Sequence, residues 1–170
     1  MNILTEIHRH ENLNILGKAV YRTAIRGVAL RGRELLMVHS TEVGDYKFPG
    51  GGMNEGEQHE QALRREIQEE CGMSLLHFGQ GIGAVVEYIR PQEKDYDLFK
   101  MTSYYYLCEV DNVFGEQKLD AYEKDLGFKP VWLDIDETIR ANKSLLAREQ
   151  IPGWLKREIF VLEYIRQNLF

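Results

Sequence analysis

The chain has 170 residues, of which 44% are hydrophobic and 28% charged, a composition that excludes a disordered or collagen-like protein. The length fits one domain over residues 1–170. Of the net charge of −6, most lies between positions 55 and 70, where six acidic residues accompany only two basic ones. This localised charge favours a bound metal ion and argues against a nucleic-acid-binding surface, although a solvated acidic helix face is the alternative at this point.

The sequence shows no membrane or secretory segment and few cysteines. No apolar run approaches the ~18–20 residues of a membrane helix, and residues 1–6 lack the basic and apolar regions of a secretory signal. Two cysteines, Cys71 and Cys108, could pair with each other, but so few cysteines fit a reduced compartment better than a disulfide scaffold. We therefore expect a cytoplasmic protein with no membrane partner, and we leave a homodimer open.

The first part of the chain predicts an arm and a β-hairpin. Residues 1–17 are polar with scattered aliphatic side chains, which is typical of an arm or an edge element. Residues 19–30 alternate apolar and polar side chains, as a half-buried strand does. The Gly-containing turn at 31–33 leads into a second strand over 34–39, so the two strands are expected to pair.

A Gly-rich loop at 48–56 is followed by a predicted helix over 57–71, which Gly72 should end in the usual C-terminal position. Residues 82–90 and 101–110 are rich in β-branched and aromatic types and predict two more strands.

The rest of the chain predicts a loop at 91–100, a strand at 128–133 and a C-terminal helix over 153–169. That helix carries an apolar stripe at three- and four-residue spacing: Leu155, Ile159, Leu162, Ile165 and Leu169. Strands interspersed with two helices predict an α/β or α+β sandwich.

Three glutamates of the predicted helix share one arc. Glu66, Glu69 and Glu70 are at positions i, i+3 and i+4, where neighbouring Cβ atoms lie ~5–6 Å apart. Carboxylate oxygens without nitrogen or sulfur ligands favour a hard cation, Mg²⁺ or Mn²⁺. Like charges at this spacing repel, so we expect Glu70→Gln to melt at or above the wild-type temperature when no cation is bound.

The segment from residue 51 to residue 73 resembles the Nudix box, the signature of Nudix hydrolases. Its defined positions are filled by Gly51, Glu57, Arg65, Glu66, Ile67, Glu69, Glu70, Gly72 and Met73. The Phe48-Pro49-Gly50 lead-in, the strands on both sides and the late helix also resemble the family. The resemblance implies a Nudix-type α/β/α sandwich in which helices flank a mixed sheet.

The resemblance further implies hydrolysis of a nucleoside diphosphate linked to another group. Metal ligands implied by it are Glu66, Glu69 and Glu70, with the Gly50 carbonyl as a further ligand. The implied support of the site comes from a Glu57–Arg65 ion pair and from Gly51 and Gly72.

Cleavage of a diphosphate requires neutralised phosphate oxygens, which divalent ions supply together with an acidified water. A carboxylate must accept the proton of that water. In the family this base is a box glutamate, Glu66 or Glu69 here, or an acid from a later loop. The later candidates are Glu116, Asp120, Glu123 and Asp125, of which we choose Glu123; a solvated acidic loop is the alternative for any one of them.

Two other readings compete with a pyrophosphohydrolase. A Nudix-fold nucleotide sensor without catalysis usually has a degraded box or an added DNA-binding domain, and this chain has neither. A diphosphate isomerase would need a catalytic Cys and extra His ligands that we cannot place. Phe99 and the tyrosines at 104–106 could stack on a base, although aromatic strand residues are more often core, so the substrate-binding residues stay unassigned.

Overall fold

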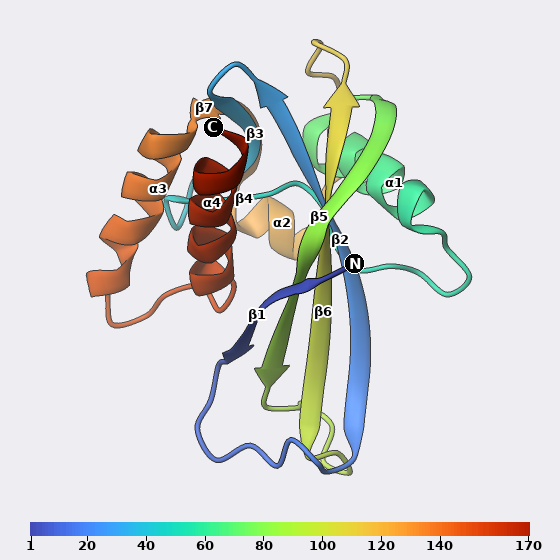
Figure 1. Cartoon of the computed structure of the whole chain (residues 1–170), viewed down its shortest axis with the longest axis vertical. Helices are drawn as coiled ribbons and strands as arrows, with labels where there is room; N and C mark the ends of the chain where they lie inside the picture. The colour runs from blue at the N-terminus through green and yellow to red at the C-terminus, as the bar shows by residue number, and fades with distance from the viewer.

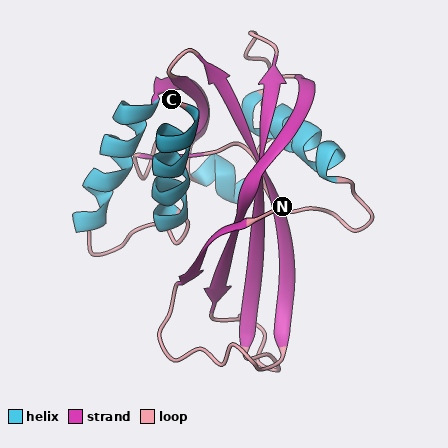
Figure 2. Cartoon of the chain, in the orientation of Figure 1, coloured by secondary structure: helices cyan, strands magenta, loops and turns pink.

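A computed structural model describes all 170 residues and places helices on both sides of a twisted sheet (Figures 1 and 2). The strands are β1 (Ile3–His8), β2 (Ala19–Arg31), β3 (Glu34–Ser40), β4 (Asp45–Lys47), β5 (Leu75–Ile89), β6 (Leu98–Val110) and β7 (Phe128–Asp134). The helices are α1 (His59–Cys71), α2 (Ala121–Asp125), α3 (Ile135–Ser144), a 3-10 turn at Leu145–Ala147, and α4 (Leu155–Leu169).

The sheet is mixed, with strand order β1-β5-β6-β2-β3-β4 and with β7 on the free edge of β3. β1 runs parallel to β5 and β2 parallel to β6, while the other pairs are antiparallel. The predicted hairpin of β2 and β3 holds together only at its tip, through Leu30–Leu35 and Arg31–Glu34. Beyond the tip the two strands diverge, which leaves an edge of β2 free for another segment.

Two hydrophobic cores lie on opposite faces of the sheet. Alternation along β2 sends Ile25 and Ala29 into the core beneath α1 and Val28 into the core beneath α3 and α4. Figure 1 shows α1 on one side of the strands and α3 with α4 on the other. The predicted α+β sandwich with a mixed sheet flanked by helices is confirmed.

The helix predicted at 57–71 begins two residues later, at His59, because Gln58 and Gln61 form a capping box there. It ends as predicted at Gly72, which has a left-handed φ of 64°. A Cβ at this position would also lie 2.4 Å from the backbone of Gly115, so both conformation and space require glycine.

Several elements differ from the sequence-based expectation. The arm at 1–17 contains strand β1, and the loop at 91–100 is shorter because β6 begins at Leu98. β5 begins at Leu75 rather than 82, and the bulges around Gly81 and Gly83 explain why no alternating pattern marks its first half.

The helices α2 and α3 were not predicted from the sequence. α2 falls within a segment expected to be an acidic loop. α3 has a buried stripe of Ile135, Thr138, Ile139 and Asn142, in which two polar side chains interrupt the apolar pattern. At its N-terminus the Asp134 side chain accepts hydrogen bonds from the amides of Asp136 and Glu137.

The C-terminal helix starts at Leu155 and not at 153. Four residues of its predicted stripe are buried, but Leu169 is 37% exposed because it lies in the last turn. No helix in the molecule has both the length and the apolar character needed to cross a membrane.

Candidate active site

The segment after β4 occupies the free edge of β2. The amides of Ile25 and Gly27 donate to the carbonyls of Gly51 and Pro49, both at 2.9 Å, and the amide of Met53 donates to Thr23 at 3.0 Å. These bonds fix the Pro49–Met53 loop along β2 at the place where β3 has diverged. The loop is therefore positioned by the sheet and not by its own sequence alone.

The loop backbone requires glycine at Gly50 and leaves little room for a side chain at Gly51. Gly50 has φ of 132°, and a Cβ there would lie 2.0 Å from the Ile25 carbonyl oxygen. At Gly51 a Cβ would lie 2.6 Å from both carboxylate oxygens of Glu66. The Glu66 carboxylate therefore packs directly against the loop backbone.

The three helix glutamates differ in environment. Glu66 and Glu70 are buried, at 7% and 0% exposure, while Glu69 is partly exposed. Burial, reinforced by the neighbouring Glu70 carboxylate, raises the pKa of Glu66 to about 7 although Arg65 opposes the shift. Glu66 thus lies in a site that disfavours its negative charge even with Arg65 beside it.

Arg65 links the helix to the loop. Its Nε and Nη2 donate to the two carboxylate oxygens of Glu57 at 2.9 and 3.0 Å, a bidentate ion pair, and Nη2 also donates to the Gly52 carbonyl at 3.1 Å. Its Nη1 donates to Glu66 at 2.7 Å and to Glu69 at 3.0 Å. These contacts raise the pKa of Arg65, and the hydrogen bond from Arg65 lowers that of Glu57.

Glu70 has different partners from Glu66 and Glu69. It forms an ion pair with Lys47 and accepts a hydrogen bond from the Gly50 amide at 2.7 Å. The predicted ligand Gly50 carbonyl accepts a hydrogen bond from Arg26. The structure therefore brings Glu66 and Glu69 together on Arg65, but it does not gather three acidic, His or Cys side chains around one point.

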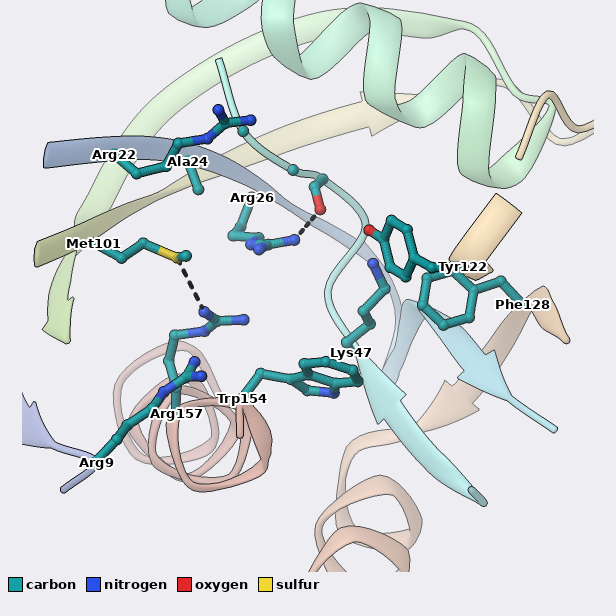
Figure 3. Close-up of a pocket in the computed structure, with 13 residues that line it drawn as sticks. Arg9, Arg22, Ala24, Arg26, Lys47, Met101, Tyr122, Phe128, Trp154 and Arg157 are labelled. Carbon is teal, nitrogen blue, oxygen red and sulfur yellow. Dashed lines mark hydrogen bonds between the residues drawn. The ribbon is translucent and has the colours of Figure 1, made fainter. Parts of the chain in front are cut away.

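A pocket of about 240 Å³ lies on the other side of the loop, against α4 (Figure 3). The backbone of Gly50–Gly52 forms part of its wall. Its lining includes five basic residues and no acidic one: Arg9, Arg22, Arg26, Lys47 and Arg157. Figure 3 shows Tyr122 and Phe128 at one end and Arg22 with Met101 at the other. Such a pocket can accept anionic groups and an aromatic ring.

Glu123, expected in a loop, lies in α2 beside this pocket. Both its carboxylate oxygens are engaged, one by the Asp120 amide at 2.9 Å and one by the Tyr122 hydroxyl at 3.0 Å. Tyr122 lines the pocket, whereas Glu123 does not. A role of Glu123 as the base stays a prediction.

Sequence reasoning missed the basic pocket. One local signal was present: Arg22 and Arg26 occupy alternate positions of one strand, on the face that also carries Ala24, where a core strand would have apolar residues. The tyrosines considered as base-stacking residues are mostly structural. Tyr104 and Tyr106 pack against the core beneath α1, and Tyr105 belongs to the opposite core.

Comparison with known proteins places the chain in a family. The NUDIX domain model matches residues 20–153, which include the whole segment from Gly51 to Met73. A search of the curated proteins found no match.

Solved structures share the fold at low sequence identity. A NUDIX hydrolase from Nitrosomonas europaea is 20% identical, with a TM-score of 0.59 over 87% of this chain and 90% of that one. The E. coli ORF135 protein is 15% identical, with a TM-score of 0.55 over 86% and 91%. A MutT protein from work on Aliivibrio salmonicida and Vibrio cholerae is 18% identical, with a TM-score of 0.51 over 87% and 99%. With the family match over most of its length, this chain belongs to the Nudix hydrolases, enzymes that act on diphosphate bonds.

Proposed function

We propose that the protein is a Mg²⁺- or Mn²⁺-dependent pyrophosphohydrolase that cleaves a nucleoside diphosphate linked to another moiety, by attack of water on phosphorus. The observation that carries the proposal is the position of the Gly50–Gly52 loop, between carboxylates on α1 and a basic pocket on its other side. A diphosphate lying along this loop would have cation-binding groups on one side and arginines on the other. A nucleotide sugar, a (d)NTP or a related compound fits this description.

The donor chemistry fits a hard divalent cation. Glu66, Glu69 and Glu70 offer only carboxylate oxygens, and the buried charge of Glu66 gains from a cation. In this structure Arg65 and Lys47 hold those oxygens, so a divalent ion must compete with both side chains. When bound, the ion supplies neutralisation of phosphate charge and acidification of water.

The residues of the chain have separate tasks in this proposal. Glu66, Glu69 and Glu70 hold the cation, with the Gly50 carbonyl as a further ligand. Glu69 is the most accessible of the carboxylates and is a base candidate together with Glu66 and, from α2, Glu123. The Glu57–Arg65 pair keeps helix and loop in register.

One observation favours the sensor alternative. The ion pair between Lys47 and Glu70 neutralises one of the three box carboxylates without any metal. A binding protein that holds a nucleotide without cleaving it could retain such a pair permanently. The proposed enzyme must exchange it for a cation.

We also propose that residues 1–170 form one domain and that the protein works in the cytoplasm. The two cores share one continuous sheet, which supports the first proposal. Cys71 and Cys108 are both free and buried, which agrees with a reducing compartment.

The test is a phosphate-release screen of nucleotide sugars, dinucleoside polyphosphates, (d)NTPs and oxidised nucleotides. We expect turnover of at least one compound with millimolar Mg²⁺ or Mn²⁺ and none with EDTA. Tight binding of a nucleotide without turnover in either condition would favour the sensor. Undiminished turnover in EDTA, with metal removal verified, would refute the metal role.

A further inference from the structure

The basic residues around the pocket fall into two groups. Three of them pair with buried carboxylates: Arg9 with Glu87, Arg157 with Glu87 and Glu158, and Lys47 with Glu70. The other two, Arg22 and Arg26, have no carboxylate within ion-pair distance. The pocket wall therefore carries two guanidinium groups without a salt-bridge partner.

Both arginines lie against the loop. Arg26 is 8% exposed; its Nη1 donates to the Gly50 carbonyl, and its Nε has no partner. The Arg22 guanidinium lies over Gly52, where a Cβ would come within 2.2 Å of its Nη2. Because burying a charge without an ion-pair partner is costly, an anion bound in the pocket would stabilise Arg26 beyond what the more distant Glu66 carboxylate supplies.

The adjacent strand adds more unpartnered polar atoms on the same face. In the register of β2 and β6, Ala24 lies opposite Ser103 and Arg26 opposite Tyr105. The hydroxyls of Ser103 and Tyr105 are buried and have no hydrogen-bond partner, like the Arg26 Nε. Buried polar atoms are nearly always bonded, so these three, of which only the Arg26 atom belongs to a lining residue, make this face of the sheet suited to a bridging water or a polar ligand.

We propose that the pocket binds an anionic group on the moiety attached to the scissile diphosphate, and that Arg26 and Arg22 recognise it. The preferred substrates are thus diphosphates whose second moiety carries a further phosphate or a carboxylate. This inference rests on the proposed hydrolase function and narrows its substrate class. With a neutral sugar or an unmodified ribose, the shared diphosphate would be the only anion of the substrate near the two guanidinium groups.

Matched pairs of substrates test the proposal with Mg²⁺ present. ADP-ribose is compared with ADP-ribose 1″-phosphate, whose extra phosphate is on the second ribose, and UDP-glucose with UDP-glucuronic acid, so the two pairs distinguish a phosphate from a carboxylate. We expect kcat/KM for the anionic member of at least one pair to be higher by about tenfold or more, because a charge-assisted pair forms with the arginines. Equal kcat/KM within both pairs would overturn the proposal.

Two variants and one control locate the preference. Arg22→Gln and Arg26→Lys should each reduce the anionic-to-neutral ratio of kcat/KM about tenfold, mainly through KM. Arg90→Gln removes an exposed arginine that follows β5 and does not line the pocket, so it should keep the ratio. If Arg26→Lys fails to fold, the exposed Arg22 still tests the assignment. A ratio unchanged in Arg22→Gln, or equal losses for both members of a pair, would mean that the arginines bind the shared diphosphate or only brace the loop.

Binding in EDTA separates this inference from the proposed function. Calorimetry with the same pairs on the metal-free protein requires no catalysis. Absence of turnover on every pair refutes the hydrolase for these compounds, yet tighter binding of the anionic member would still support the anion site. Equal affinity within both pairs, or binding of none of the four compounds, would overturn it.

Discussion

The ion pair between Glu70 and Lys47 reverses the effect that the sequence predicts for Glu70→Gln. From spacing alone, neutralising one of three clustered carboxylates should relieve repulsion and stabilise the metal-free protein. In the structure Glu70 is fully buried and compensates the ammonium of Lys47, whose side chain is 7% exposed. The substitution would leave that ammonium buried without its partner.

The two effects differ in size. Repulsion between like charges at helical spacing is worth about 0.2–0.5 kcal/mol, whereas removing one member of a buried ion pair costs about 3–5 kcal/mol. We expect a cost at the lower end of the range of about 3–5 kcal/mol for two reasons. Lys47 lines a pocket, and the side-chain carbonyl of the introduced glutamine can still accept the hydrogen bond from the Gly50 amide. We expect Glu70→Gln to lose about 3 kcal/mol in EDTA, or roughly 6–12 °C in melting temperature for a chain of this length.

The assay is thermal unfolding in EDTA of wild type, Glu70→Gln, Lys47→Met and the double variant. Lys47→Met and Glu70→Gln should each destabilise, and the double variant should be more stable than the sum of the single losses predicts, because both charges are removed together. Glu69→Gln is the matched control, since Glu69 is partly exposed and its carboxylate pairs only with Arg65. A Glu70→Gln protein that melts at or above wild type would refute the compensation argument and restore the repulsion argument.

Four further outcomes test the site. Arg65→Ala should lower the free energy of unfolding by about 2 kcal/mol and reduce activity, since it removes the partner of Glu57 and the link to the loop; unfolding at the wild-type temperature would contradict the bracing role. Glu69→Gln should lower kcat by about 10²-fold with little change in melting temperature, and a near-normal kcat would exclude it as ligand and base. Gly51→Ala should reduce activity by displacing the Glu66 carboxylate, so full activity would disprove their close contact. Mg²⁺ at about ten times its Kd should stabilise the wild type by ~1.4 kcal/mol, and an equal gain in Glu66→Gln would show that Glu66 is no ligand.

The part of the site that could be predicted depends on the spacing of residues within one segment of the sequence. Glu66, Glu69 and Glu70 share a helix face because of helical geometry, and Gly72 ends that helix because it adopts a left-handed conformation. Elements with a regular pattern, such as β2 and α4, were predicted within a few residues. Elements with an irregular pattern were not predicted. Examples are the first half of β5, which is rich in glycine, and α3, whose buried stripe contains polar residues.

The pocket could not be predicted in the same way, because tertiary packing assembles it. Arg9 arrives through the parallel pairing of β1 with β5, and Arg157 comes from the last helix. Lys47 belongs to a strand of three residues, too short for any pattern. These residues meet at one pocket only through contacts between segments that are far apart in the sequence. The largest separation, between Arg9 and Arg157, is 148 residues.

The buried charges of α4 make better sense as loop supports than as a source of stability. A buried ion pair is often no more stabilising than apolar residues of the same size, so the Arg157–Glu158 pair needs another explanation. The second oxygen of Glu158 accepts a hydrogen bond from the Phe48 amide at 3.0 Å. From the opposite layer, Glu70 accepts from the Gly50 amide at 2.7 Å. Two fully buried carboxylates thus hold amides two residues apart, one from each side of the sheet, and Arg157 and Lys47 supply the counter-charges that allow them to be buried. Because the loop is hydrogen-bonded to both layers, a shift of one helix alone does not carry the loop with it. The loop backbone therefore stays fixed between the box carboxylates and the basic pocket.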